Sequence, residues 1–285
     1  MIYTKLDGGL GNQFFQLLAA FHFSKHDSNK ICVLENNCNT SVVRSLFQDL
    51  KFVSNEACPN FANFVINDSF SNKIRKSLLK KIPPSISKYI YWNEGVNYNL
   101  VDLEINDVIL DGYWQDLSLI SGCIEVLKER VLAYKFSENF YEVKNLMMER
   151  ECINVHVRRG DYLNSQFKNK FDVCGVSYYL DAIGRATNMV GNSPTINIFT
   201  NDQEWCFDNL GNKFENVNVI SARGYLTDFE EMILIGLAKC VVIPNSTFSW
   251  WGAVLSEQAE NVICPKSWFN GYDRKSLIKN NWIRI

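Results

Sequence analysis

Short apolar runs rich in β-branched residues recur along this 285-residue chain. Between many of them lie longer stretches in which apolar residues return every three or four positions, as they do on one face of a helix. This alternation of strands and helices predicts an α/β protein with parallel sheets. The predicted strands are Ile2–Leu6, Ile31–Leu34, Val108–Leu110, Cys152–Val157, Thr195–Thr200, Val217–Ile220, Cys240–Ile243 and Val262–Cys264.

The second half of the chain shows the alternation most clearly. Helices are predicted near Ser177–Asn188, near Gln203–Leu210 and over Asp228–Lys239, each following a predicted strand. This pattern is Rossmann-like and begins just before Cys152. The length suits two domains, so we expect Rossmann-like domains at residues 1–150 and 151–285, facing a central cleft. No strand is predicted between Asn36 and Ile105, where polar and aromatic residues break any period.

A basic stretch, Lys73–Lys81, spaces Ile74, Leu78 and Ile82 four residues apart. The spacing predicts an amphipathic helix. Such a helix either packs on its own domain with a solvated outer face, which is the ordinary case, or lies on an anionic membrane.

Composition narrows the function classes. The 29 basic and 31 acidic residues leave a formal charge of −2, which gives no overall drive toward nucleic acid. The nine cysteines are odd in number and form no CxxC, and several lie in apolar runs as small hydrophobes, so a cytoplasmic setting is expected. No stretch of 18 uninterrupted apolar residues predicts a spanning helix.

A glycine-rich turn, Gly8–Gln13, lies between the first predicted strand and a helical run at Phe14–Phe23. Glycines let the backbone approach a phosphate, and a helix start offers N–H groups to it. A tight structural turn explains the segment equally well. The spacing is neither GxGxxG nor GxxxxGK[ST], which disfavours a dinucleotide oxidoreductase.

The segment His156–Tyr162 continues a predicted strand whose alternation places His156 and Arg158 on one face. Its charged end falls at the carboxyl edge of the sheet, where open α/β sheets bind ligands. Adjacent arginines and a histidine are hard to bury without an anion, and a guanidinium suits phosphate. An internal salt bridge from Arg158 or Arg159 to Asp161 is the alternative.

A further candidate lies where the strand Cys240–Ile243 runs into Asn245–Ala253. The Asn-Ser-Thr sequence predicts a helix N-cap, with a helix over Phe248–Glu257. The hydroxyl groups and the helix start predict a second phosphate-binding end. Trp250 and Trp251 are interpreted mainly as core.

Asp202, at another strand end, is either a ligand or a cap residue. There are three histidines, and only His22 and His26 are close in sequence. No cysteine or carboxylate cluster completes a zinc site around them. The Asp-x-Asp arrangement of many metal-dependent sugar transferases is also absent. Neither a metal nor a resident cofactor is therefore expected.

Four segments together, Gly8–Gln16, His156–Tyr162, Phe199–Asp202 and Asn245–Ala253, resemble the α-1,2-fucosyltransferases of glycosyltransferase family 11. The resemblance is to short bacterial members and implies a GT-B fold. It further implies a metal-independent, inverting transfer of L-fucose from GDP-β-L-fucose to the 2-hydroxyl of a terminal β-galactoside in O-antigen or blood-group-like glycans. The second domain is expected to hold GDP-fucose and the first to hold the acceptor.

The resemblance also implies roles for individual residues. Arg158 is expected to grip the β-phosphate, His156 to contact the nucleotide and Asp228 to bind guanine. The expected phosphate and ribose loop is Asn245, Ser246, Thr247, Phe248 and Ser249. The loop expected to close on the pyrophosphate is Gly11, Asn12 and Gln13.

The remaining roles are less determined. Gly112–Gln115 is similar to a family segment placed near the acceptor. Asp161 is the nearest motif carboxylate for a catalytic base, with Asp116 and Glu94 as alternatives. The alternative functions are the same donor with another linkage or acceptor, and a noncatalytic GDP-sugar-binding protein. A lipid-linked acceptor would suit peripheral contact with the cytoplasmic face of the inner membrane.

Overall fold

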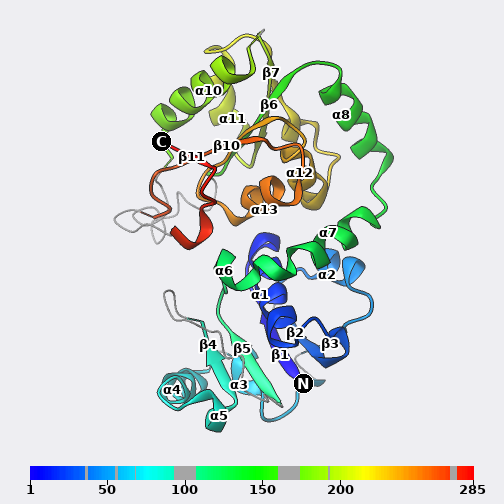
Figure 1. Ribbon diagram of the computed structural model, residues 1–285, viewed down its shortest axis with the longest axis vertical. Helices are drawn as coiled ribbons and strands as arrows, with labels where there is room; N and C mark the ends of the chain where they lie inside the picture. The colour runs from blue at the N-terminus through cyan, green and yellow to red at the C-terminus, as the bar shows by residue number, and fades with distance from the viewer. Residues whose placement is uncertain are drawn as a thin grey trace. The chain divides into compact units, whose positions relative to one another are not determined.

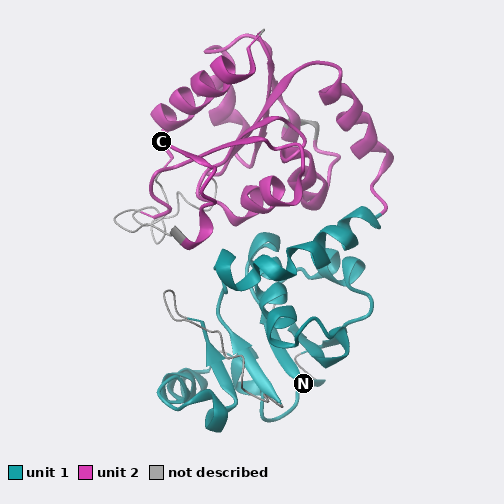
Figure 2. Cartoon of the chain, viewed as in Figure 1, with its two compact units in different colours: residues 1–134 teal, residues 135–285 magenta. Residues whose placement is uncertain are grey.

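The computed structural model describes residues 1–35, 38–54, 57–67, 69–92, 107–159, 174–191, 193–269 and 275–285. Two compact units, Met1–Tyr134 and Lys135–Ile285, divide the chain (Figure 2). The predicted boundary at residue 150 lies inside the second unit. The reason is that helix α8 (Glu138–Met148) belongs there: the Ser137 N–H that precedes it donates to Glu230 Oε1 at 2.8 Å.

The first unit is built on a parallel five-stranded sheet in the order β3-β2-β1-β5-β4 (Figure 1). Helix α1 packs along β1 on one face, and an apolar cluster that includes residues of α3 covers the other. The strands are β1 (Ile2–Leu6), β2 (Ile31–Glu35), β3 (Lys51–Val53), β4 (Tyr89–Tyr91) and β5 (Val108–Asp111). The helices are α1 (Leu10–Phe23), α2 (Ser41–Leu46), α3 (Asn63–Ile66), α4 (Phe70–Leu79), α5 (Pro84–Ser87), α6 (Leu117–Ile120) and α7 (Ile124–Leu132).

The second unit contains a parallel six-stranded sheet in the order β11-β10-β9-β6-β7-β8. Numbered within the unit and read from its β8 edge, this is 3-2-1-4-5-6, the doubly wound Rossmann order. The strands are β6 (Cys152–Val157), β7 (Thr195–Thr200), β8 (Val217–Val219), β9 (Cys240–Val242), β10 (Asn261–Cys264) and β11 (Ile283–Arg284). The helices besides α8 are α10 (Val176–Val190), α11 (Gln203–Cys206), α12 (Asp228–Ile235) and α13 (Thr247–Leu255).

Strand β6 shows the predicted alternation. Ile153, Val155 and Val157 join the core that α10 covers. On the opposite face, Asn154 Nδ2 donates to the last two carbonyls of α12, Leu234 O at 2.8 Å and Ile235 O at 3.1 Å. The α/β class with parallel sheets is therefore confirmed, and α12 is fixed to the sheet by a buried side chain.

Some element boundaries differ from expectation. Strands β3 and β4 lie in the segment for which no strand was predicted, and each has only three residues. The helix predicted over Gln203–Leu210 divides into α11 and a π-helical turn at Phe207–Gly211. Among the described residues, no helix is long and apolar enough to cross a membrane.

Candidate active site

Arg158 and Arg159 follow β6 at the carboxyl edge of the second sheet. The strand order reverses between β6 and β9, and open parallel sheets bind ligands outside the strand ends at such a switch point. The ring of Phe248, in the first turn of α13, lies 5.4 Å from the ring of His156, centroid to centroid. The end of β6 and the start of α13 therefore share this edge.

Arg159 is satisfied within the protein. Its Nε lies 3.3 Å from Asp202 Oδ2, and its guanidinium stacks 4.1 Å above the ring centroid of Trp205. Asp202 also caps α11 by accepting the Trp205 N–H at 3.2 Å. The expectation that both arginines require an external anion is thus wrong for Arg159, and Asp202 has the cap role that was one of its two interpretations. Asp161, the expected salt-bridge partner, lies outside the described residues.

His156 is 4% exposed, and its burial, followed by the charge of Arg158, lowers its pKa to about 3. The ring is therefore neutral at physiological pH. Its Nδ1 is buried with no hydrogen-bond partner among the described residues. A neutral imidazole offers a nitrogen to a ligand but no positive charge. Charge for an anion at this edge therefore comes from Arg158 rather than from the histidine.

The predicted loop at the start of α13 serves two purposes. Asn245 is buried and structural: its Nδ2 donates to Trp268 O at 2.9 Å. Ser249 is fully buried, and its hydroxyl donates back to Ser246 O at 3.5 Å. Ser246 is the N-cap residue, but no side chain caps the helix. The Ser246 N–H itself donates to Pro244 O at 2.8 Å, so the first turn of α13, which follows it, is the part of the helix start suited to an anion.

Helix α12 begins at Asp228, the residue expected to bind guanine. The Asp228 side chain is exposed and takes no part in the cap. Thr227 and Glu230 form a reciprocal capping box that satisfies the helix start without it. The sequence predicted the N-terminus of this helix correctly, and the structure leaves the Asp228 carboxylate at the surface of its first turn.

Glu231 is a titratable residue that sequence reasoning missed. Burial raises the pKa of its carboxyl to about 7, against a hydrogen bond from Ser221 that lowers it, and the nearby Asp228 raises it further. The Ser221 hydroxyl donates to Glu231 Oε2 at 2.9 Å and accepts the Thr200 N–H at 2.9 Å. No local sequence signal distinguishes it from Glu230, because its contact with Ser221, which also binds the end of β7, forms only in the folded unit.

Glu231→Gln is expected to flatten the pH dependence of stability. The folded-state pKa is raised above its ordinary value of 4.5, so the native state favours the protonated carboxyl. The stabilisation that the protonated carboxyl gives the native state is fully present below pH 4.5 and is lost as the pH rises through about 7. It amounts to roughly 3 kcal/mol at most. In urea unfolding, the free energy of unfolding should fall more between pH 5 and pH 8 for the wild type than for the variant. The exposed Glu215→Gln is the control, and parallel pH profiles for wild type and Glu231→Gln would contradict the assignment.

In the first unit, the glycine-rich turn is held by amide side chains. Gly8 has φ +76°, and a Cβ there would lie 2.9 Å from Asn12 Nδ2, so glycine is required. Gln13 Nε2 donates to Gly8 O at 2.9 Å and to Asn39 O at 3.0 Å. Gln115 Nε2 donates to Asn12 Oδ1 at 2.7 Å. The turn is therefore a fixed structural turn that opens α1, and its role as a phosphate cradle stays a prediction.

The residues expected to meet the pyrophosphate differ in access. Gly11 and Gln13 are buried, whereas Asn12 is half-buried. The N-cap residue of α1 is Gly9, and no side chain caps this helix either. The backbone of the turn and Asn12 are thus the parts available to a ligand from this unit.

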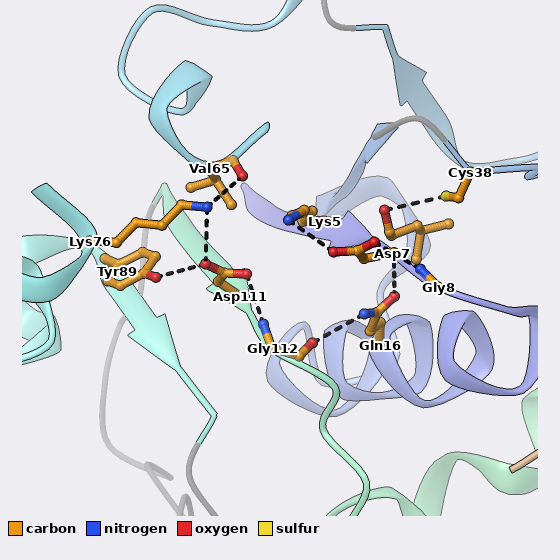
Figure 3. A network of polar contacts seen from close by, with 11 residues as sticks. Lys5, Asp7, Gly8, Gln16, Cys38, Val65, Lys76, Tyr89, Asp111 and Gly112 are labelled. Carbon is orange, nitrogen blue, oxygen red and sulfur yellow. Dashed lines mark hydrogen bonds and ion pairs between the residues drawn. The ribbon is translucent and has the colours of Figure 1, made fainter. Parts of the chain in front are cut away.

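A polar network lies behind this turn at the switch point between β1 and β5 (Figure 3). Gln16 bridges the two strand ends: its Oε1 accepts the Asp7 N–H at 2.9 Å and its Nε2 donates to Gly112 O at 3.2 Å. Lys5 is 6% exposed and pairs with Asp7 at 3.1 Å. A lysine inside an apolar strand, followed by an aspartate, was a sequence signal that went unused.

The second half of the network surrounds Asp111. Its Oδ2 accepts the Tyr89 hydroxyl at 2.7 Å, and Lys76 Nζ approaches the same oxygen at 3.9 Å. Its Oδ1 accepts the Gly112 N–H at 2.9 Å. These contacts tie α4, β4 and β5 together, so Gly112, the first residue of the predicted acceptor segment, has a fixed backbone.

The rest of the acceptor segment is divided between core and surface. Trp114 is fully buried against Phe23, with ring centroids 5.5 Å apart, whereas Tyr113 is exposed. Asp116 caps α6 and accepts the Ser118 N–H at 2.9 Å. Glu94, the other alternative base, lies outside the described residues. Tyr113 is thus the aromatic side chain of this segment that a ligand can reach.

Trp250 and Trp251 belong to the core, as interpreted. Both are fully buried, with ring centroids 4.9 Å apart, and Trp250 Nε1 donates to Leu277 O at 2.5 Å. Within the described part of the chain, no three His, Cys, Asp or Glu side chains gather as metal ligands would. The absence of a metal requirement stays a prediction.

Two solved structures share this fold. Fucosyltransferase NodZ from Bradyrhizobium superposes with a TM-score of 0.52 and 14% identity, covering 90% of this chain and 93% of that chain. NodZ α-1,6-fucosyltransferase co-crystallised with GDP superposes with a TM-score of 0.51 and 15% identity, covering 90% of this chain and 92% of that chain. This likeness defines the class of protein by fold: a GT-B protein, as expected.

The sequence profile of Glycosyl transferase family 11 matches residues 107–285, more than half of the chain. The protein belongs to this family. It is 25% identical over full length to the Escherichia coli O-antigen biosynthesis glycosyltransferase WbnK. It is also 25% identical to an Escherichia coli alpha-1,2-colitosyltransferase, covering 100% of this chain and 99% of that enzyme. A 107-residue stretch, 38% of this chain and 29% of that protein, is 27% identical to human galactoside alpha-(1,2)-fucosyltransferase 1.

Proposed function

We propose that this glycosyltransferase moves L-fucose from GDP-β-L-fucose to the 2-hydroxyl of a terminal β-galactoside, with inversion at the anomeric carbon and without a metal. The observation that carries the donor class is the switch point of the second sheet, where the end of β6, followed by Arg158, lies beside the start of α13 through the rings of His156 and Phe248. A guanidinium and a helix N-terminus both suit a diphosphate. GDP is inferred from the NodZ complex, and the sugar and linkage from the relatives' names.

The proposed reaction is a single displacement at the anomeric carbon. The bond between the fucosyl anomeric carbon and the β-phosphate oxygen breaks, and GDP departs with that electron pair. The acceptor oxygen attacks from the opposite face and loses its proton to a base, giving the α-linked product. Negative charge grows on the leaving phosphate, so Arg158 contributes by stabilising that charge. His156, being neutral, contributes a buried ring nitrogen beside the nucleotide.

The acceptor is assigned to the first unit, where Tyr113 is exposed and Asn12 half-buried beside the switch point of that sheet. An exposed aromatic ring next to amide groups suits a sugar. The full-length similarity to WbnK supports a place in O-antigen biosynthesis, for which a lipid-linked acceptor and a cytoplasmic location are the corresponding proposals.

Colitosyl transfer is the second candidate, because the colitosyltransferase is as similar over full length as WbnK. Colitose is L-fucose without its 3-hydroxyl group, so one pocket could favour either sugar. GDP release should be measured with GDP-fucose and GDP-colitose, each with lactose and with Galβ1,3GalNAc, and the product linkage determined by NMR. Faster release with GDP-colitose would replace the fucosyl assignment.

The same assay tests whether the protein is an enzyme of the proposed kind. Release of GDP that requires a galactoside, with an α-1,2 product, supports transfer. Transfer to a different hydroxyl would keep the donor and change the linkage. Binding of GDP-fucose by calorimetry without turnover on either acceptor would favour a noncatalytic GDP-sugar-binding protein.

A further inference from the structure

Helix α4 carries its apolar side outward. Phe70 is 80% exposed, and large apolar side chains follow it at intervals of four through α4 and α5. This basic apolar stripe consists of Phe70, Ile74, Leu78, Ile82 and Ile86. Both helices lie beside the edge strand β4 of the first unit (Figure 1). An ordinary surface helix buries its apolar side, so this orientation is the reverse of the usual one.

The side of α4 that faces the protein is held by two cationic side chains and by the half-buried Leu79, which packs against the apolar cluster of the first unit. Lys76 Nζ donates to Val65 O at 3.0 Å and lies 3.9 Å from Asp111. The Arg75 guanidinium sits 4.4 Å above the Phe64 ring centroid. No residue of α4 is buried. The helix therefore packs on its own domain with a solvated outer side, as in the ordinary interpretation, and its contacts leave the stripe exposed.

The stripe is also flanked by positive charge. The segment from Phe70 to Lys88 holds six Lys and Arg residues and no Asp or Glu, in a chain whose formal charge is −2. Lys73, Lys81 and Lys88 are exposed along it. Leu132, the other strongly exposed apolar residue at 86%, lies instead in α7 among side chains of both signs.

We propose that the basic apolar stripe docks the first unit onto an anionic lipid surface. Apolar side chains in a row, flanked by lysines, fit the boundary between acyl chains and negatively charged headgroups. A protein partner with an acidic rim would match the charge, but the row spans two helices with exposed lysines on its flanks, which suits a planar surface. The site chemistry of Arg158 and α13 plays no part in this contact.

Vesicle flotation of the full chain tests the proposal. Wild type should float with vesicles of phosphatidylglycerol and phosphatidylethanolamine and remain unbound with phosphatidylcholine alone. Phe70→Ser with Ile86→Ser should weaken binding by about tenfold or more through lost apolar contact. Lys73→Glu with Lys81→Glu should weaken it at least as much, and 1 M salt should weaken the wild type. Leu132→Ser, an equally exposed apolar residue elsewhere, should bind as the wild type does.

Three results would overturn the proposal. The first is no binding of wild type to anionic vesicles, and the second is an equal loss for Leu132→Ser. The third is a wild-type dimer in light scattering that Phe70→Ser with Ile86→Ser dissolves, since a second copy would then cover the stripe. Unchanged thermal unfolding of each variant shows that the fold is intact. Because the readout is vesicle binding, failure of this proposal leaves the proposed transferase activity untouched, and the reverse also holds.

Discussion

Arg158→Ala is expected to lower kcat by about 10²- to 10³-fold, the typical effect of removing one donor to developing transition-state charge. Arg158 follows the buried strand β6 at the switch point, and its neighbour His156 is neutral and provides no replacement charge. Arg159 is engaged by Asp202 and Trp205, so it does not substitute either. GDP release in the presence of a galactoside, measured alongside thermal unfolding, checks the loss of activity against the integrity of the fold.

Two further variants distinguish the positive charge of Arg158 from the planar geometry of its guanidinium donors. Arg158→Lys keeps the charge but loses the planar pair of donors, so it should recover only part of the activity. Arg185→Ala removes an exposed arginine that pairs with Asp181 within α10, and it should be neutral. Near-normal turnover of Arg158→Ala with an unchanged unfolding temperature would remove Arg158 from the donor site.

The longer strands could be predicted because each is a short run rich in β-branched residues, and in β6 the apolar and polar side chains alternate. Strands β1, β6 and β7 have the predicted bounds. Strands β3 and β4 could not, because three residues show no alternation and their burial comes from pairing with β2 and β5. The two compact units divide after Tyr134 rather than at the predicted residue 150 for a related reason. Helix α8 belongs with the second unit through contacts of Ser137 with Glu230 that are distant in sequence.

The candidate site shows the same division. Local signals found Arg158, the start of α13 and the Gly8 turn, because each is marked by residue types at a strand end. They could not show that Arg159 forms an ion pair with Asp202, since that pair joins the ends of two neighbouring strands. Nor could they show that Glu231 is half-buried or that His156 is neutral, because both depend on how α12 and α13 pack.

Gly252→Ala is expected to be the most destabilising single substitution proposed for this chain. Helices α12 and α13 cross with their backbones in contact: a Cβ on Gly252 would lie 2.5 Å from Met232 O, and one on Gly236 would lie 2.2 Å from Gly252 O. A backbone carbonyl has no alternative rotamer, so the helices must separate, and overpacking of this kind costs about 1–3 kcal/mol or more. Separation also moves the start of α13 away from β6, so activity should fall even where the variant is folded. Urea unfolding and GDP release measure the two effects.

Gly184→Ala, in the middle of α10 with no atom within 4 Å of the added Cβ, is the control and should be neutral or stabilise the protein by up to about 1 kcal/mol. If Gly252→Ala unfolds at the wild-type urea midpoint, the close crossing of α12 and α13 is not what positions the helix start beside Arg158.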